Sequence, residues 1–294
     1  MSATEAINRA YIGLDAWDDE TILETLAEGQ GRAVAAIQAA LPDIAAAARA
    51  IAARIGPRGR IIYTGAGSSG LIAALDGVEL GGTFGWPDGR VAFAVAGGPV
   101  MTPGMSNRAE DDGARGEADM KALKPTGEDV AIAVAASGTT PYTLAAANAA
   151  RTAGTLTIGI ANNREAALLA AVDVPVLLDT GPEVIAGSTR LNAGTAQKAA
   201  LALISTLAMI RLGHVYDGLM VDMRIDNTKL HRRALAALMH ITGSDEEAAE
   251  TALARAGGKI KPAALILKGI APAEADRILE RARGNLRTAL AELE

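Results

Sequence analysis

Short apolar runs alternate with longer segments in which apolar residues recur every three or four positions. The short runs predict strands at 60–64, 91–96, 130–135, 156–160 and 174–178. The periodic segments predict helices at 20–55, from near Ser69 onward, and at 111–123, 141–153 and 190–212. Such alternation is typical of an α/β fold, a doubly wound, mostly parallel sheet with helices on both faces.

The pattern changes after Met239, where glycines and prolines interrupt shorter helical stretches. Three short helices are expected there, at Thr242–Gly257, Lys261–Gly269 and Ala273–Leu293. We therefore predict an N-terminal helical segment (1–55), a main domain (56–238) and a small helical C-terminal domain (239–294). Residues 99–112 predict a loop within the main domain.

Two loops rich in glycine and hydroxyl groups follow predicted strands. They are Tyr63-Thr-Gly-Ala-Gly-Ser-Ser-Gly70 and Ala136-Ser-Gly-Thr-Thr-Pro141. A strand, such a loop and then a helix form a phosphate-binding geometry, because backbone N–H groups and the helix N-terminus attract anions. Neither loop carries the lysine of a nucleotide-binding P-loop, which favours a small phosphorylated metabolite.

The hydroxyl groups of these loops are the candidate phosphate and sugar ligands. They belong to Ser68, Ser69, Ser137, Thr139 and Thr140. Each of them can equally be a helix N-cap. Ser188 and Thr189, which follow Gly187 at another helix start, have the same two interpretations. Glu183 is a candidate ligand for a sugar hydroxyl, although its Gly-Pro-Glu context also fits an ordinary turn.

Composition narrows the function further. The chain has no cysteine, which excludes disulfides, thiolate catalysis and cysteine-bound zinc, and its three histidines lack metal-pair spacing. We expect no metal and no cofactor. A net charge of −6 argues against nonspecific nucleic-acid binding. No segment has the pattern of a membrane span or of an N-terminal secretory signal, so we expect a cytoplasmic protein.

Two glutamates are candidate acid–base groups. Glu79 lies in the nearly uncharged stretch 71–86, where partial burial would raise its pKa, as a proton donor requires. Its alternative is a solvated residue near a helix end. Glu110 opens a Glu-Asp-Asp triplet, which the preference of acidic residues for helix N-termini also explains.

The position of Glu79 along the predicted helix determines whether it can reach a ligand bound at the first loop. An unbroken helix from Ser69 would place Glu79 about 15 Å from the loop, beyond the reach of a hexose phosphate bound there. Either the helix breaks near Gly77, or Glu79 completes the site of a second subunit. We predict the second arrangement.

Several motifs occur in an order that resembles a known family. They are Gly65-Ala-Gly-Ser-Ser-Gly70, Asp76-Gly-Val-Glu79, Gly181-Pro-Glu-Val184, Gly187-Ser-Thr-Arg-Leu191 and Leu219-Met-Val-Asp222. The chain resembles the N-acetylmuramic acid 6-phosphate etherases, which have the sugar isomerase (SIS) fold. The C-terminal segment resembles the ubiquitin-associated-like (UBA-like) end of that family.

The resemblance implies a cytoplasmic homodimer that needs no metal and has its active site at or near the subunit interface. It implies a lyase of peptidoglycan recycling and amino sugar catabolism that binds a sugar phosphate. The lactyl ether of N-acetylmuramic acid 6-phosphate is cleaved to N-acetylglucosamine 6-phosphate and D-lactate by elimination and hydration. Glu79 would then be the proton donor and Glu110 the base at C2.

The chain departs from the family at Leu71 and Asn192, where basic residues are usual. The absence of these two basic side chains is expected to alter the affinity for the phosphate or for the lactyl carboxylate. Two other functions on this fold are alternatives: a noncatalytic sugar-phosphate sensor, similar to the glucokinase regulatory protein, and an aldose–ketose isomerase. Retention of both Glu79 and Glu110 favours an enzyme over a sensor.

Overall fold

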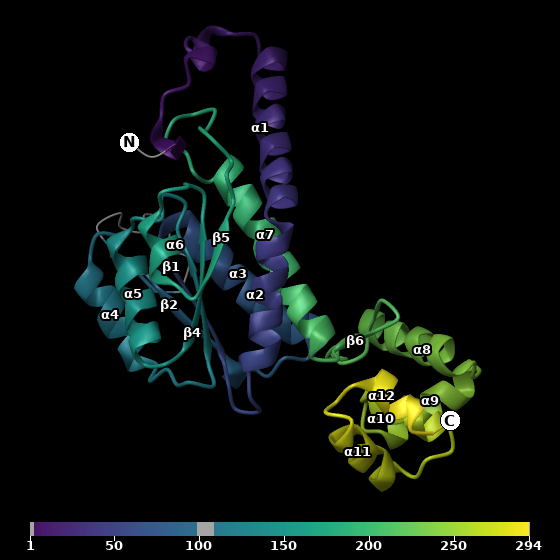
Figure 1. Ribbon diagram of the computed structural model, residues 1–294. Coiled ribbons are helices and arrows are strands. Elements are labelled where there is room, and N and C mark those ends of the chain that lie inside the picture. Colours follow the sequence, from purple (N-terminus) through teal and green to yellow (C-terminus); the bar gives the residue numbers. More distant parts are fainter. Residues whose placement is uncertain (1–2, 99–108, 294) are drawn as a thin grey trace. The chain divides into compact units, whose positions relative to one another are not determined.

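A computed structural model describes residues 3–98 and 109–293 of the chain (Figure 1). Its central sheet is entirely parallel, with the strand order β2-β1-β3-β4-β5. The strands are β1 Ile61–Gly65, β2 Val91–Val95, β3 Val130–Val134, β4 Leu156–Ala161 and β5 Val174–Leu177. The predicted α/β class and all the predicted strands are confirmed. Residues 99–108 of the expected loop lie outside the described part of the chain.

Helices cover both faces of this sheet. Those flanking it are α1 Asp19–Ala39, α2 Leu41–Arg54, α3 Gly67–Phe84, α4 Gly113–Ala122, α5 Pro141–Thr152, α6 Ala167–Ala171 and α7 Asn192–Arg211. In Figure 1, α4, α5 and α6 lie on one side of the sheet, and α2, α3 and α7 on the other. Neighbouring residues of β1 point to opposite faces, so Ile62 packs in the cluster with Met120 of α4, while Tyr63 contacts Gly77 of α3.

A buried hydrogen-bond network fixes α3 and α7 on their face of the sheet. The Tyr63 hydroxyl donates to the Asp76 Oδ2 atom at 2.7 Å, and the Ser205 hydroxyl donates to Oδ1 at 3.0 Å. Tyr63 belongs to β1, Asp76 to α3 and Ser205 to α7. Because a buried carboxylate must be hydrogen-bonded to be tolerated, these bonds specify how the three elements pack.

The described chain forms two compact units that differ from the predicted division. One comprises the described residues 3–78, 89–98 and 109–205, the other residues 79–88 and 206–293. The predicted boundary at 238/239 falls inside α8 (Thr228–Thr242), whose buried Ala234 and Leu238 belong to the core of the second unit. The further elements of that unit are β6 Val215–Tyr216, β7 Leu219–Met220, α9 Glu246–Arg255, α10 Ile260–Leu267, α11 Pro272–Arg281 and α12 Leu286–Ala291.

The expectation of one helix over Ala273–Leu293 is wrong, because α11 and α12 are separate. Arg283 and Gly284 have φ of 52° and 74°, which is left-handed backbone that ends a helix. Asn285 then caps α12, its side chain accepting from the Thr288 N–H at 3.1 Å. The C-terminal part therefore has α9 to α12 after α8, not three helices.

One described helix, Asn192–Arg211, is long and apolar enough to cross a membrane. Helices α1 and α2 are long and apolar enough only when taken together, and a 59° bend separates them. The sequence-based statement that no segment has such a composition is therefore wrong for α7. In the structure, 56% of that stretch is buried inside the protein, which is typical of a core helix.

Two glycines determine how closely α3 approaches β1. A Cβ atom on Gly70 would lie 2.8 Å from the Gly65 carbonyl carbon and 2.9 Å from Val95. We predict that Gly70→Ala lowers the free energy of unfolding by about 1–3 kcal/mol, because backbone must move to admit the methyl group. Urea unfolding measures this cost. Gly31→Ala is the matched control: Gly31 is helical with nothing within 4 Å of the added methyl, so the variant should be at least as stable as wild type.

Candidate active site

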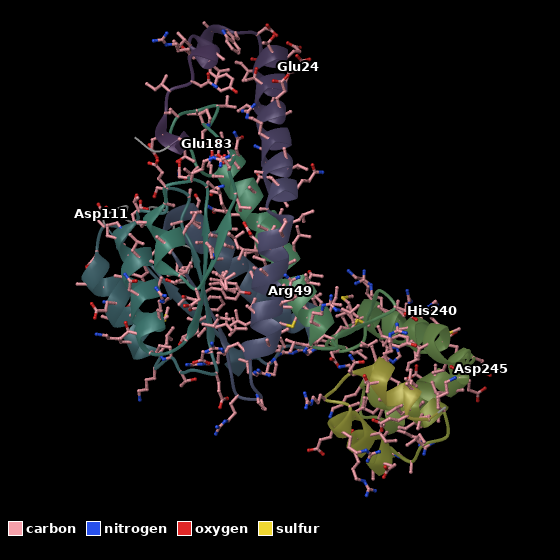
Figure 2. All side chains as sticks on the ribbon, in the orientation of Figure 1. Glu24, Arg49, Asp111, Glu183, His240 and Asp245 are labelled. Carbon is pink, nitrogen blue, oxygen red and sulfur yellow. The ribbon has the colours of Figure 1, made fainter. Side chains whose placement is uncertain are left out.

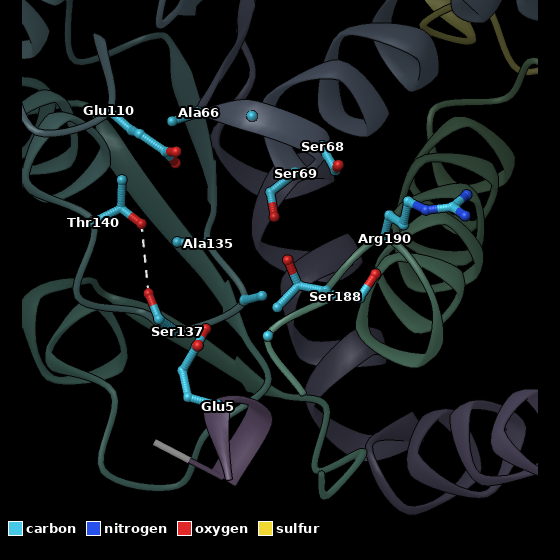
Figure 3. Close-up of a pocket in the computed structure, with 14 residues that line it drawn as sticks. Glu5, Ala66, Ser68, Ser69, Glu110, Ala135, Ser137, Thr140, Ser188 and Arg190 are labelled. Atoms are coloured by element: carbon cyan, nitrogen blue, oxygen red, sulfur yellow. Dashed lines mark hydrogen bonds between the residues drawn. The ribbon is translucent and has the colours of Figure 1, made fainter. Parts of the chain in front are cut away.

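A pocket of about 410 Å³ opens at the carboxyl ends of β1 and β3 (Figure 3). Gly65 lies opposite Val134 in the parallel ladder, so the loops that follow these strands leave the sheet at the same edge. A third loop, before α7, and the N-terminal 3-10 helix η1 (Ala3–Glu5) complete the lining. The lining residues are Glu5, Ala66, Gly67, Ser68, Ser69, Glu110, Ala135, Ala136, Ser137, Thr140, Gly187, Ser188, Thr189 and Arg190.

The first loop presents the N-terminus of α3 to the pocket. Gly67 has a φ of +53°, and the helix begins at this residue. Ser68 and Ser69 therefore occupy the first turn, where backbone N–H groups have no partner within the helix. Hydroxyl groups and free N–H groups at one place form an anion site without a charged side chain.

The second loop is ordered by its own hydroxyl groups. Ser137 Oγ accepts from the Thr139 N–H at 3.2 Å and lies 3.5 Å from the Thr140 hydroxyl. Thr140 directly precedes α5, yet its side chain makes no capping hydrogen bond, so its hydroxyl faces the pocket instead. Thr139, a predicted ligand, is exposed and does not line the pocket.

Buried Glu183 supports the third loop, which precedes α7, from the interior of the protein. Its fully buried carboxylate accepts from the backbone N–H groups of Asn192 and Ala193, each at 2.9 Å, and so caps α7. Burial raises the pKa of Glu183, although these two hydrogen bonds and Arg32 act in the opposite direction. Glu183 caps α7 and is absent from the pocket lining, and the predicted sugar contact stays a prediction. Ser188 and Thr189, which do line the pocket, are thereby freed from capping α7.

Glu110 contributes a carboxylate to the pocket lining, next to the first glycine- and serine-rich loop. Its backbone carbonyl accepts from the Tyr142 N–H at 3.0 Å, which ties it to the first turn of α5. The carboxylate lies beside Gly67 and is half-buried. Burial, and then the charge of Asp111, raise its pKa, which makes it a stronger base than an ordinary glutamate.

Glu79 does not line this pocket. It lies on α3, which runs unbroken from Gly67 to Phe84, so the alternative of a helix break near Gly77 is wrong. Ten residues from Ser69 to Glu79 correspond to about 15 Å along the helix axis. The side chain is exposed, so this single chain does not provide the burial expected for a proton donor.

Sequence analysis did not single out two of the lining residues, and two positions where the chain departs from the family lie outside the lining. Glu5 and Arg190 line the pocket, and Arg190 is the one basic residue among the described lining residues. Leu71 and Asn192 do not line it; Asn192 is fully buried. Arg190 stands in a quoted motif, whereas Glu5 gave no local signal.

Within residues 3–98 and 109–293, no group of three or more histidine, aspartate or glutamate side chains is arranged to hold a metal ion. Figure 2 shows all the described side chains on the ribbon.

The parallel sheet and the hydroxyl-lined pocket at its carboxyl edge define a protein of the SIS class. The family profile of the glucokinase regulatory protein N-terminal SIS domain matches residues 43–151. A crystal structure of a Bacteroides fragilis protein assigned as a phosphosugar isomerase of capsule formation shares the fold. Its TM-score is 0.51 at 18% identity, over 67% of this chain and 94% of the other.

The full-length relatives are more specific. N-acetylmuramic acid 6-phosphate etherase of Deinococcus radiodurans is 49% identical over 98% of this chain and 95% of its own length. The etherases of Rubrobacter xylanophilus and Serratia proteamaculans are 43% and 42% identical, over 95% and 98% of this chain and 92% and 97% of their own lengths. The chain belongs to the N-acetylmuramic acid 6-phosphate etherase family.

The capping role of Glu183 predicts a specific pair of effects for Glu183→Ala. Loss of a cap costs about 0.5–2 kcal/mol, and loss of the loop support should weaken binding of inorganic phosphate. Urea unfolding and calorimetric titration with phosphate measure the two. Asp245→Ala is the control: Asp245 caps α9 through the Ala248 N–H at 2.8 Å and does not line the pocket, so it should lose stability alone. Unchanged phosphate affinity in Glu183→Ala would contradict the support role.

Proposed function

We propose that this chain is a carbon–oxygen lyase that cleaves the lactyl ether of N-acetylmuramic acid 6-phosphate at the pocket described above. The products are N-acetylglucosamine 6-phosphate and D-lactate. The observation that carries the proposal is the half-buried Glu110 carboxylate beside Gly67, in a chain 49% identical to an etherase over nearly its full length. A sugar phosphate held by the first two loops would place its carbon chain near this base.

The pocket suggests how the substrate is held. Ser68, Ser69, Ser137 and Thr140, together with the N-termini of α3 and α5, bind the phosphate. Ser188 and Thr189 approach from the third loop and bind the sugar chain. In this arrangement uncharged donors stabilise the phosphate by hydrogen bonds, so the ionised Glu110 is not paired with a lysine or arginine that would weaken it as a base.

The reaction then proceeds in two halves on the open-chain sugar. Glu110 removes the proton at C2, which the neighbouring C1 carbonyl acidifies, and the C3–O bond breaks as an acid protonates the departing lactate oxygen. A C2–C3 double bond results. Water adds to it, placing a hydroxyl at C3 and a proton at C2. Glu79 is the proposed acid.

We propose that Glu79 of one subunit contributes to the pocket of a second subunit. Leu75 and Val78 are exposed by 46% and 68%, and helical spacing puts them with Glu79 on one face of α3. Exposed apolar side chains around a functional carboxyl are typical of a surface that another protein covers. We infer a homodimer in which each Glu79 serves the partner's site, and a cytoplasmic role in recycling cell-wall sugars.

The assay is D-lactate release from N-acetylmuramic acid 6-phosphate, with exchange of the C2 proton into deuterated solvent as the second readout. Glu110→Gln should lose both, by about 10²–10⁴-fold, because the base is missing. Glu79→Gln should lose lactate release while keeping C2 exchange. Sugar-phosphate binding without lactate release in wild type would instead identify a sensor.

Mixing the two inactive variants tests the shared site. With random subunit exchange, half of the dimers are hybrids, and one of their two sites has both glutamates intact, so about a quarter of wild-type activity should return. Co-expressing the two variants with different affinity tags and purifying over both tags is the control, because it ensures that hybrid dimers are present. If Glu79 served its own chain, no intact site would form and the mixture would stay inactive.

The raised pKa of Glu110 predicts a pH effect. In Asp111→Asn the neighbouring negative charge is lost, so the Glu110 proton leaves more easily and its pKa falls. The acidic limb of the kcat/KM profile for lactate release should therefore move to lower pH, although burial, the larger cause, keeps part of the shift. Glu128→Gln, a change at a half-buried residue outside the pocket, should leave the limb in place. A shift to higher pH would contradict the assignment of Glu110 as the titrating base.

A further inference from the structure

The N-terminal turn η1 is anchored against the pocket by a buried side chain. Thr4 is fully buried, its N–H donates to Asn163 Oδ1 at 3.4 Å, and its hydroxyl accepts from Asn163 Nδ2 at 3.2 Å. The Gly187 N–H donates to the Thr4 carbonyl at 3.0 Å. The same Asn163 amide donates to the Ala136 carbonyl at 2.8 Å. One amide thus joins η1 to the second loop, and one backbone bond joins it to the third.

This anchoring delivers Glu5 into the pocket. Its carboxylate lies against Gly187, since a Cβ built on that glycine would be 2.9 Å from Glu5 Oε2. Figure 3 shows Glu5 and Glu110 entering from different elements, with Ser137 and Thr140 between them in that view. No hydrogen bond or ion pair joins the Glu5 carboxylate to another described residue, so its oxygens are available to a ligand.

The chemistry of a carboxylate restricts what it can bind here. An ionised carboxylate repels the phosphate and the lactyl carboxylate of the substrate. It has no proton to donate, so it forms hydrogen bonds only with ligand groups that carry an O–H or N–H. In the open-chain sugar, the donors are the free hydroxyl groups and the acetamido N–H. A carboxylate placed beside a phosphate-type loop therefore suits the carbon chain of a sugar phosphate and disfavours a second anion.

We propose that Glu5 is a specificity-determining residue that accepts hydrogen bonds from the hydroxyl or acetamido groups of the bound sugar, and that Thr4 and Asn163 position it. The inference rests on the proposed function, in that it takes the same pocket to bind an N-acetylated sugar phosphate. It assigns to η1 the recognition of the sugar, and to the serine- and threonine-rich loops the recognition of the phosphate.

The test compares two ligands by calorimetric titration of the full chain: N-acetylglucosamine 6-phosphate and inorganic phosphate. Glu5→Ala should weaken sugar-phosphate binding about 10- to 100-fold, the range for a lost hydrogen bond to a charged group. Its affinity for inorganic phosphate should be equal to or higher than that of wild type. Glu5→Gln, which keeps one acceptor, should lie between Glu5→Ala and wild type for the sugar phosphate.

Asp15→Asn is the matched control, because it removes one exposed negative charge from the same N-terminal segment without lining the pocket. It should bind both ligands as wild type does. Wild-type affinity of Glu5→Ala for the sugar phosphate would overturn the proposal. An equal loss for both ligands would also overturn it, since Glu5 would then support the third loop only. Binding is measured without turnover, so a wild-type protein that binds but releases no lactate contradicts the proposed function and leaves the Glu5 result standing.

Discussion

The meeting of three backbone segments at Gly65 is the constraint on which the rest of the site depends. A Cβ atom there would lie 2.9 Å from both the Gly70 Cα and the Val134 carbonyl oxygen. Without side chains at Gly65 and Gly70, the first turn of α3 packs directly onto the end of β1, beside β3. Because β1 and β3 are parallel and in register, the two hydroxyl-rich loops then share one edge of the sheet. Displacing α3 would separate the helix N-terminus from the second loop.

The charge balance of the pocket follows from the kind of donor used. The described lining holds two carboxylates, Glu5 and Glu110, and one guanidinium, Arg190. An anionic substrate is therefore met mainly by hydroxyl groups and backbone N–H groups. These attract a phosphate strongly at short range without bringing a full positive charge beside Glu110. The pKa of Glu110 is raised by burial and by Asp111, whereas a neighbouring cation would lower it. Because the phosphate is bound by uncharged donors, the same small pocket can also hold an effective carboxylate base.

Buried polar side chains below the loops decide where the lining residues stand. Glu183 holds the start of α7, and Asn163 holds both η1 and the Ala136 carbonyl. Neither lines the pocket. A buried carboxylate or amide must have its hydrogen bonds satisfied, so each fixes its partners closely. The Thr4–Asn163 contact spans 159 positions, and no local sequence pattern indicates it, which explains why sequence analysis overlooked Glu5.

The sequence alone determined the strands, most of the flanking helices and both hydroxyl-rich loops, because hydrophobic periodicity, glycine and hydroxyl placement are local signals. It also indicated Glu110. Tertiary structure decided the rest. It freed Thr140 from capping, left Thr139 exposed and outside the pocket lining, buried Asn192, and brought η1 to the pocket. It also showed that α3 does not break before Glu79, and that α8 packs with the C-terminal helices. These outcomes depend on which distant segments compete for the same space and the same hydrogen bonds, a competition settled only when the chain is folded.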